Sequence, residues 1–123
     1  MSNIETYTSN LLTIEVEENQ SEINIRFKGK STERDPSGFI SPVLLESMQN
    51  SKKFSKKIRM DFMELEYMNS STITPIIKIL ENANDMGNSI LILYRKSKKW
   101  QELCFSALRI FETKDHRIEI TGK

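Results

Sequence analysis

Short runs of apolar and β-branched residues alternate with longer stretches of helical periodicity, and this alternation restricts the fold more than any other feature of the chain. A polar stretch at residues 17–20 separates the first two runs and indicates an antiparallel hairpin. One helical stretch separates each later run from the next, which favours right-handed crossovers and parallel pairing. The pattern predicts an α/β fold of order β-β-α-β-α-β-α-β, with a mixed four- to five-stranded sheet and helices largely on one face. The expected strands are residues 11–17, 21–28, 58–62, 90–94 and 117–121.

The first helix has two candidate starts. Asp35-Pro36 and Ser41-Pro42 each join a good N-cap residue to a proline that would occupy the first helical position. Residues 29–38 are polar and are expected to form the loop before this helix. The apolar periodicity ends near Asn50, so the basic stretch 51–57 is expected to connect the helix to the next strand.

The second helix is affected by Pro75, which has no amide hydrogen to donate to a carbonyl four residues back. We therefore expect the regular helix to begin late, with Thr74 as its N-cap, and to end at Gly87. A third helix is expected over residues 100–111. Its apolar stripe consists of Trp100, Leu103, Cys104, Ala107, Leu108 and Phe111.

The composition excludes several classes of protein. A length of 123 residues predicts one domain spanning residues 1–123, and a net charge of +1 gives no reason to expect nucleic acid or a membrane as a partner. One cysteine and one histidine exclude a disulfide scaffold and a site built on several such ligands, so no metal is expected. No apolar run approaches the roughly 20 residues of a membrane span, and no secretory signal is visible. A cytoplasmic location is therefore predicted.

Side chains that carry catalytic chemistry are scarce. Cys104 lies on the apolar stripe of its helix and is expected to be an ordinary core residue. His116 lies among charged residues and is expected to be solvated. The four glycines do not form a phosphate-cradling loop. We therefore expect a protein that is not an enzyme and that carries no cofactor.

Two clusters of basic residues lie beside the ends of expected strands. Solvated connector residues explain them, and a patch that binds polyanions is the alternative, with binding that would depend steeply on salt. Retention on heparin at physiological salt would favour the patch. The first cluster is Lys52, Lys53, Lys56, Lys57 and Arg59, and the second is Arg95, Lys96, Lys98 and Lys99.

The segment from residue 58 to residue 94 carries a more specific pattern. Asp61-Phe62 ends a strand, residues 69–73 read Asn-Ser-Ser-Thr-Ile, and residues 84–93 combine a helix end, a glycine and a buried strand. This order resembles the STAS domain of bacterial anti-sigma factor antagonists, in which Asp-Leu is followed by Asp-Ser-Ser-Gly-Leu at the start of a helix. The resemblance covers residues 11–120 in element order and implies a single STAS-like domain. Its sequence-level match is confined to residues 61–93.

The STAS resemblance implies a phosphorylation switch at Ser70. In that family the first serine of the motif is phosphorylated by a serine kinase and anti-sigma factor of the GHKL ATPase type, and a protein phosphatase restores the unmodified form. Asn69, Ser71 and Thr72 would then shape the surface that binds the partner. A serine at a helix N-terminus is exposed, and the free N–H groups there can accommodate a phosphate. The resemblance implies a non-catalytic regulatory module that binds its partner when unphosphorylated and is released by phosphorylation.

Three positions depart from the STAS motif. Asn69 replaces the acidic residue, Thr72 replaces the glycine, and Pro75 interrupts the helical pattern. With the helix starting at Thr74, Ser70 would lie in the turn before it. The residue types at 69–72 are also preferred helix caps, so a cap without a switch explains the same run.

A second family is also similar to this chain. The biofilm-regulating STAS-like phosphoproteins carry an Asn-Thr-Ser-Ser motif after a similar strand, a longer loop before the first helix and a proline inside the helical pattern. Residues 69–72, the loop 30–38 and Pro42 resemble these features. That resemblance again implies modification of Ser70, with a diguanylate cyclase as the partner that the unmodified form activates. A small-ligand or nucleotide sensor is a further alternative, since some STAS domains are credited with such binding.

Overall fold

The computed structural model describes residues 3–123 and consists of one mixed sheet covered by helices. The elements in chain order are β1 (Asn3–Ser9), β2 (Leu12–Glu18), β3 (Glu22–Ser31), α1 (Ser37–Phe54), β4 (Lys57–Asp61), β5 (Leu65–Met68), α2 (Ser70–Met86), β6 (Ile90–Tyr94), α3 (Lys99–Ala107), the 3₁₀ helix η1 (Leu108–Phe111) and β7 (Ile118–Gly122).

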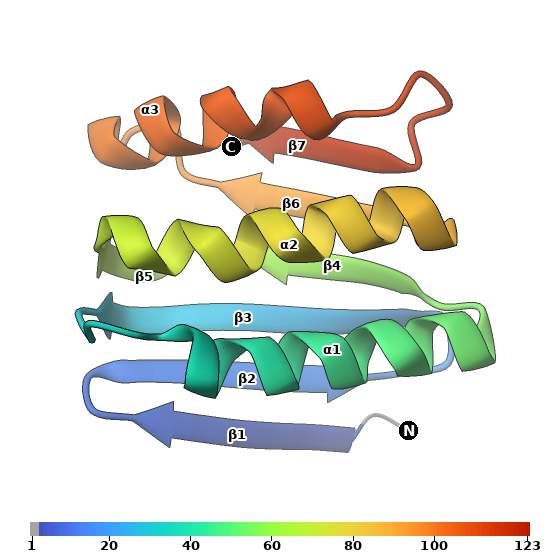
Figure 1. Ribbon diagram of the computed structural model, residues 1–123, viewed down its shortest axis with the longest axis horizontal. Helices are drawn as coiled ribbons and strands as arrows, with labels where there is room; N and C mark the ends of the chain where they lie inside the picture. Colours follow the sequence, from blue (N-terminus) through green and yellow to red (C-terminus); the bar gives the residue numbers. More distant parts are fainter. Residues whose placement is uncertain (1–2) are drawn as a thin grey trace.

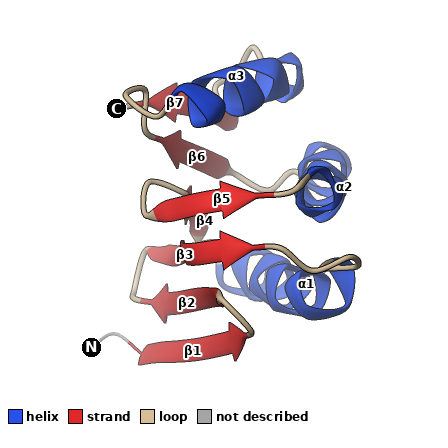
Figure 2. Ribbon diagram, turned by 90° about the vertical axis from the view of Figure 1, so that its left-hand side faces the viewer, coloured by secondary structure: helices blue, strands red, loops and turns tan. Residues whose placement is uncertain are grey.

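The sheet has the order β1-β2-β3-β4-β6-β7, and β5 pairs with β3 beyond the end of β4. The β1–β2 and β2–β3 pairs are antiparallel, and every later pair is parallel. All three α-helices lie on one face of the sheet, as Figure 2 shows. The predicted α/β class, the antiparallel opening hairpin, the parallel crossovers and the one-sided helices are therefore confirmed.

The predicted number of strands is too small, because the sheet has seven strands instead of four or five. β1 was missed because most of its side chains are exposed, so it lacks the apolar alternation that marks a half-buried strand. β5 was missed because it has only four residues. β3 extends into the expected loop as far as Ser31, past Gly29, whose positive φ of 87° and contact with the Leu11 carbonyl leave no room for a side chain.

The core lies between the helices and the inner face of the sheet. Its largest side chains form a row of rings: Phe27 stacks on Phe62 at 4.4 Å between centroids, and Phe62 lies 4.7 Å from Phe105. Tyr94 stacks on the other side of Phe105 at 5.7 Å. This row joins β3, β6 and α3 through the residue that follows β4, so the start of the β4–β5 connection is held in the core.

The predicted start of the second helix is wrong. α2 begins at Ser70 with Asn69 as its N-cap, and Pro75 lies inside it as the sixth residue. A proline costs little so close to a helix start, because only the Ser71 carbonyl loses its partner four residues on. In α1 the Asp35-Pro36 option is nearly correct: Pro36 is the N-cap and Ser37 the first residue.

The third predicted helix is divided, because a 3₁₀ turn, η1, follows α3 at Leu108. Its predicted apolar stripe is buried only in part: Leu108 lies in the core, whereas the buried residues of α3 itself are Gln101 and Phe105. Leu103, expected to be buried, is 70% exposed. None of the described helices combines the length and the hydropathy needed to cross a membrane.

Candidate functional site

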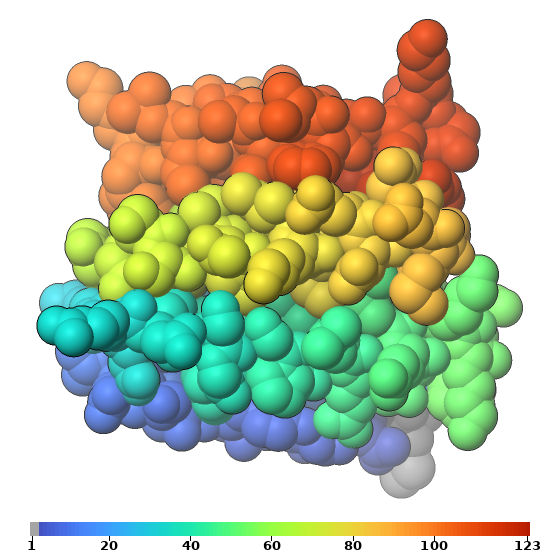
Figure 3. Space-filling model, viewed as in Figure 1, coloured from blue at the N-terminus to red at the C-terminus, as the bar shows by residue number. Residues whose placement is uncertain are grey.

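Ser70 lies at the end of the molecule where the parallel strands finish. β3, β4 and β6 all run towards this end, and both α2 and α3 begin there, at the left of Figure 1. In α/β sheets the carboxyl ends of the strands are the usual place for a binding site. Ser70 is the first residue of α2, and its side chain is exposed. In Figure 3 the first turn of α2 is the yellow-green end of the face that the helices form.

Asn69 holds the start of α2 with both ends of its carboxamide. Its Oδ1 accepts hydrogen bonds from the backbone N–H of Thr72 at 3.1 Å and from the Thr72 hydroxyl at 2.8 Å. Its Nδ2 donates to the carbonyl of Glu33 at 2.7 Å. The STAS aspartate that it replaces could supply the acceptor but not the donor. The carboxamide therefore joins the helix to the loop before α1 without adding a negative charge.

Thr72 does not lie on the surface. Its side chain is fully buried, and its hydroxyl lies 2.7 Å from the Ser31 hydroxyl at the end of β3. The expectation that Thr72 contributes directly to a partner surface is therefore not met by its side chain, which instead packs where glycine stands in the STAS motif. Asn69 and Ser71 are half-buried, so Ser70 presents the most accessible hydroxyl of the motif.

The loop at residues 32–36 extends this network to the turn between β1 and β2, at the β1 edge of the sheet. The Glu33 carboxylate accepts hydrogen bonds from the Ser9 hydroxyl at 2.8 Å and from Asn10 Nδ2 at 2.6 Å, in the turn between β1 and β2. The contacts of Glu33 and Ser31 with the motif were missed in the sequence. Their partners are 36 and 41 residues away, so no local pattern marks them.

A hollow of about 350 Å³ lies beside Ser70, between the first turns of α2 and α3. Cys104 is half-buried there and packs against the core, so the expected core residue lies at the edge of the core. Burial raises the pKa of the Cys104 thiol, which keeps it protonated at neutral pH. The residues that line the hollow are Met68, Asn69, Ser70, Ile73, Trp100 and Cys104.

The electrostatics at the start of α2 suit a negative group. The first turn of α2 contains no acidic residue, so the positive end of the helix dipole is not neutralised from within the helix. The second basic cluster lies at the same end of the molecule, and two of its four side chains already have backbone partners. Lys98 Nζ donates to the carbonyls of Met63 and Leu65 at 3.3 and 3.1 Å, and Arg95 Nε donates to Met63 at 3.3 Å.

Gln101 is a second residue that sequence reasoning missed. It is fully buried at the start of α3, and its Nε2 donates to the carbonyls of Phe62 and Leu65 at 2.7 and 2.9 Å. Its Oε1 accepts from the Arg95 N–H at 2.7 Å. Gln101 thus fixes α3, which forms one wall of the hollow, to the backbone on either side of the β4–β5 turn. A polar residue one position from an apolar stripe gives no sequence signal for this role.

The exposed Ser70 at the start of a capped helix, beside an apolar hollow, is an arrangement suited to a regulatory protein that binds a partner. The family model of the SiaC family regulatory phosphoproteins matches residues 8–102. The chain therefore belongs to the SiaC family.

A solved structure has the same fold. It is a chain of the crystal structure of the diguanylate cyclase SiaD in complex with its activator SiaC from Pseudomonas aeruginosa. The match has a TM-score of 0.66 and covers 97% of this chain and 99% of that chain, at 16% sequence identity. At this identity the likeness shows the fold alone. No curated protein sequence matches the chain.

Proposed function

We propose that this protein is a non-catalytic module that binds and activates a diguanylate cyclase while Ser70 is unmodified, and that phosphorylation of Ser70 releases it. The observation that carries the proposal is the exposed Ser70 hydroxyl at the start of α2, next to an apolar hollow. Membership of the SiaC family and the fold shared with a chain of a cyclase–activator complex support the choice of partner.

The anti-sigma factor antagonist function uses the same switch with a different partner. It rests on the resemblance of residues 61–93 to the STAS motif, whereas the family membership favours the cyclase. In both cases a serine kinase, of the GHKL ATPase type by resemblance, would add the phosphate and a protein phosphatase would remove it. The proposed role of Ser70 therefore does not depend on which of the two partners is bound.

A phosphate on Ser70 would oppose docking through its charge. Phosphorylation adds about −1.5 to −2 charges at neutral pH. The hollow next to Ser70 contains apolar side chains, and a partner that covers it removes water from the phosphate. Leaving such a charge buried and unpaired costs several kcal/mol, which corresponds to a loss of about a hundredfold or more in affinity.

The test is to measure the affinity of purified diguanylate cyclases from the same organism for the unmodified protein and for protein with phosphoserine at position 70. Cyclic di-GMP formation is followed in parallel. We expect binding and activation by the unmodified protein and by Ser70→Ala, and a loss of about a hundredfold or more with phosphoserine.

Ser37 provides the matched control, because it is the first residue of α1 as Ser70 is of α2. Phosphoserine at position 37 adds the same charge at the same helical position on the neighbouring helix. Undiminished binding with phosphoserine at 70, or an equal loss with phosphoserine at 37, would contradict the proposal. Mass mapping of the protein from its host tests the residue separately, since a phosphate found on Ser71 would move the switch by one position.

A further inference from the structure

A second hollow, of about 540 Å³, lies at the end of the molecule opposite Ser70. It is formed where α1 and α2 end and where β4 and β6 begin, at the right of Figure 1. The proposed switch at Ser70 makes no use of it. Its lining is mostly polar and includes three residues of the first basic cluster. The lining residues are Ser21, Ser51, Lys52, Ser55, Lys56, Lys57, Gly87, Asn88, Ser89 and His116.

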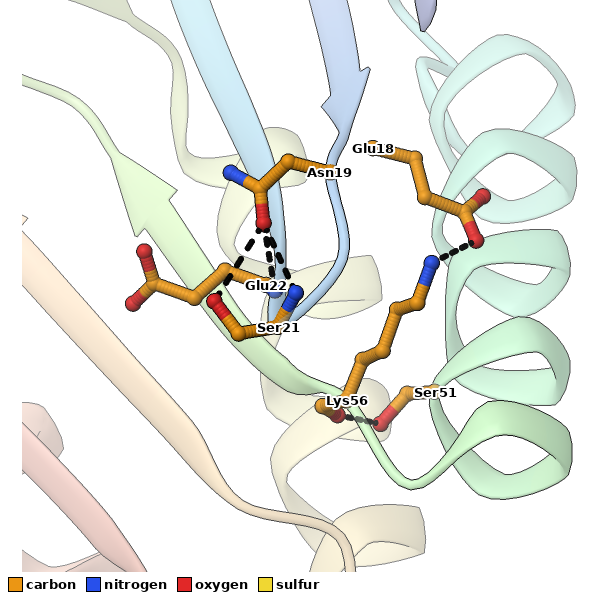
Figure 4. A network of polar contacts seen from close by, with 6 residues as sticks. All are labelled: Glu18, Asn19, Ser21, Glu22, Ser51 and Lys56. Atoms are coloured by element: carbon orange, nitrogen blue, oxygen red, sulfur yellow. Dashed lines mark hydrogen bonds and ion pairs between the residues drawn. The ribbon is translucent and has the colours of Figure 1, made fainter. Parts of the chain in front are cut away.

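Some polar groups at this hollow already have partners. Figure 4 shows Lys56 reaching the Glu18 carboxylate, a contact of 2.7 Å. The Ser51 hydroxyl donates to the Lys56 carbonyl at 2.6 Å. The Asn19 side chain accepts from the backbone N–H groups of Ser21 and Glu22, which closes the turn before β3. These contacts build the rim of the hollow and leave its other donors available.

Three donors at the hollow have no side-chain partner within residues 3–123. Lys57 has no carboxylate within 4.0 Å. The hydroxyls of Ser55 and Ser89 line the hollow and make no hydrogen bond to another described group. Lys52 is satisfied only in part, because its single contact is the neutral Met86 carbonyl at 2.7 Å. The donors left for a ligand are therefore the Lys57 ammonium, the hydroxyls of Ser55 and Ser89, and the remaining hydrogens of the Lys52 ammonium.

The charges at the hollow leave a positive excess. Of the three ammonium groups that line it, those of Lys52, Lys56 and Lys57, only that of Lys56 forms an ion pair in residues 3–123, with Glu18. The C-terminal ends of α1 and α2 add about half a negative charge each. The ammonium groups of Lys52 and Lys57 remain without a carboxylate within 4.0 Å among the described residues.

Asn88 supplies an acceptor in the same place. It is 4% exposed and lines the hollow. Its Nδ2 donates to the Ser51 hydroxyl at 3.1 Å, but its Oδ1 has no partner among the described residues. Buried polar atoms in proteins are nearly always hydrogen-bonded, so this oxygen calls for a donor. Because Oδ1 itself has less than 1 Å² of exposed surface, a ligand hydroxyl in the hollow becomes such a donor where the Asn88 side chain turns towards it.

We propose that this hollow binds a small phosphorylated molecule that carries hydroxyl groups, such as a sugar phosphate. The phosphate lies between the ammonium groups of Lys52 and Lys57, with the hydroxyls of Ser55 and Ser89 as further donors. A ligand hydroxyl donates to Asn88 Oδ1. The site is independent of Ser70 and gives the protein a second input.

The test is a titration of the full-length protein with ribose 5-phosphate, followed by amide chemical shifts. Inorganic phosphate and ribose are titrated separately. We expect saturable shifts at residues 55–57 and 87–89 with ribose 5-phosphate, and binding at least tenfold weaker with phosphate or ribose alone. Binding of phosphate as tight as that of ribose 5-phosphate would overturn the role of Asn88.

Paired substitutions separate a site from general charge attraction. Lys52→Gln with Lys57→Gln should weaken ribose 5-phosphate binding at least tenfold, while the dispersed amide spectrum shows that the variant is folded. Lys96→Gln with Lys99→Gln removes the same charge from the other end of the molecule and should leave binding unchanged. The proposal fails if the wild-type protein shows no saturable shift, or if both pairs weaken binding equally.

Discussion

The first turns of α1 and α2 have the same local pattern but different surroundings. Each helix begins with serine and has isoleucine fourth and proline sixth, in Ser37–Pro42 and in Ser70–Pro75. α1 starts without a side-chain cap, and its N-cap is Pro36. α2 starts with the Asn69 carboxamide bonded both to the helix and to the Glu33 carbonyl. The same sequence pattern therefore begins a helix in both places, but among the described residues only the N-cap of α2 joins its helix to another segment by side-chain hydrogen bonds.

This difference indicates where a switch can be placed. The charge of a modifying group changes binding most when the surrounding surface is held in one arrangement, because the partner then cannot avoid it by local movement. At α2 the exposed Ser70 shares its helical turn with Thr72, whose buried hydroxyl contacts that of Ser31. At α1 the third residue is the half-buried Phe39, which offers no polar contact of this kind.

Removing the Asn69 cap of α2 should give the largest loss of stability among the substitutions that compare the two helix starts. Asn69→Ala leaves the Thr72 N–H and hydroxyl and the Glu33 carbonyl without a shared partner, and we expect a loss of about 2 kcal/mol in the free energy of unfolding. The measurement is urea denaturation followed by circular dichroism. Asp35→Ala, just before the uncapped α1, should change stability by less than about 0.5 kcal/mol. Similar losses in the two variants would remove the distinction between the helix starts.

The buried hydroxyl pair should give the next largest effect. Thr72→Val keeps the shape of the side chain but leaves the Ser31 hydroxyl without its partner, so we expect a loss of about 1.5 kcal/mol. The double variant Ser31→Ala with Thr72→Val should be less destabilised than the sum of the single variants, because it leaves no hydroxyl unpaired. Strict additivity in the same denaturation experiment would show that the pair does not act as a unit.

The two prolines allow a comparison in which the backbone contributions cancel. Pro42 and Pro75 are each sixth in their helix, so replacement by alanine restores one amide donor and frees the unfolded chain to the same extent in both. Pro75 is buried and Pro42 is exposed. We expect Pro75→Ala to be less stable than Pro42→Ala by about 1 kcal/mol, because it also loses buried apolar contacts. Equal stabilities would mean that the Pro75 ring contributes no packing.

The smallest expected effect concerns Cys104 in the hollow beside Ser70. Alkylation proceeds through the thiolate, and burial raises the pKa of this thiol, so the thiolate fraction at a given pH is lower than for a free cysteine. The rate of labelling by iodoacetamide should therefore rise at higher pH than the rate for glutathione measured beside it. Labelling of Cys104 as fast as that of glutathione at pH 7 would indicate that the hollow is more open than the structure shows.

The sequence was sufficient for the fold class and for the position of the motif. Five strands and three helices follow from apolar periodicity, because burial on one side of an element repeats with the period of that element. The run at 69–72 predicted either a helix cap or a phosphorylation motif; the structure confirms the cap, and the modification stays a prediction. The exposed β1 and the four-residue β5 were not recognised, because neither has enough buried residues to produce a periodic signal.

Local rules gave the wrong start for α2. Thr74-Pro75 is a good pairing of cap and proline taken alone, but Asn69 has partners in the Thr72 side chain and in Glu33. The second of these contacts exists only after β3 and the loop that follows it have packed beside β5. The cap with more hydrogen bonds sets the helix start, so the late start is not adopted.

The sequence by itself determined which side chains are available: a serine motif, two basic clusters and apolar faces for one sheet and three helices. Tertiary structure alone decided what each of them contacts. It buried Thr72 against Ser31, joined Asn69 to Glu33, and placed Lys52, Lys57 and Asn88 at one hollow. The reason is physical. Secondary structure follows from neighbours a few residues apart, whereas these contacts join residues tens of positions apart that meet only when the sheet and helices are packed.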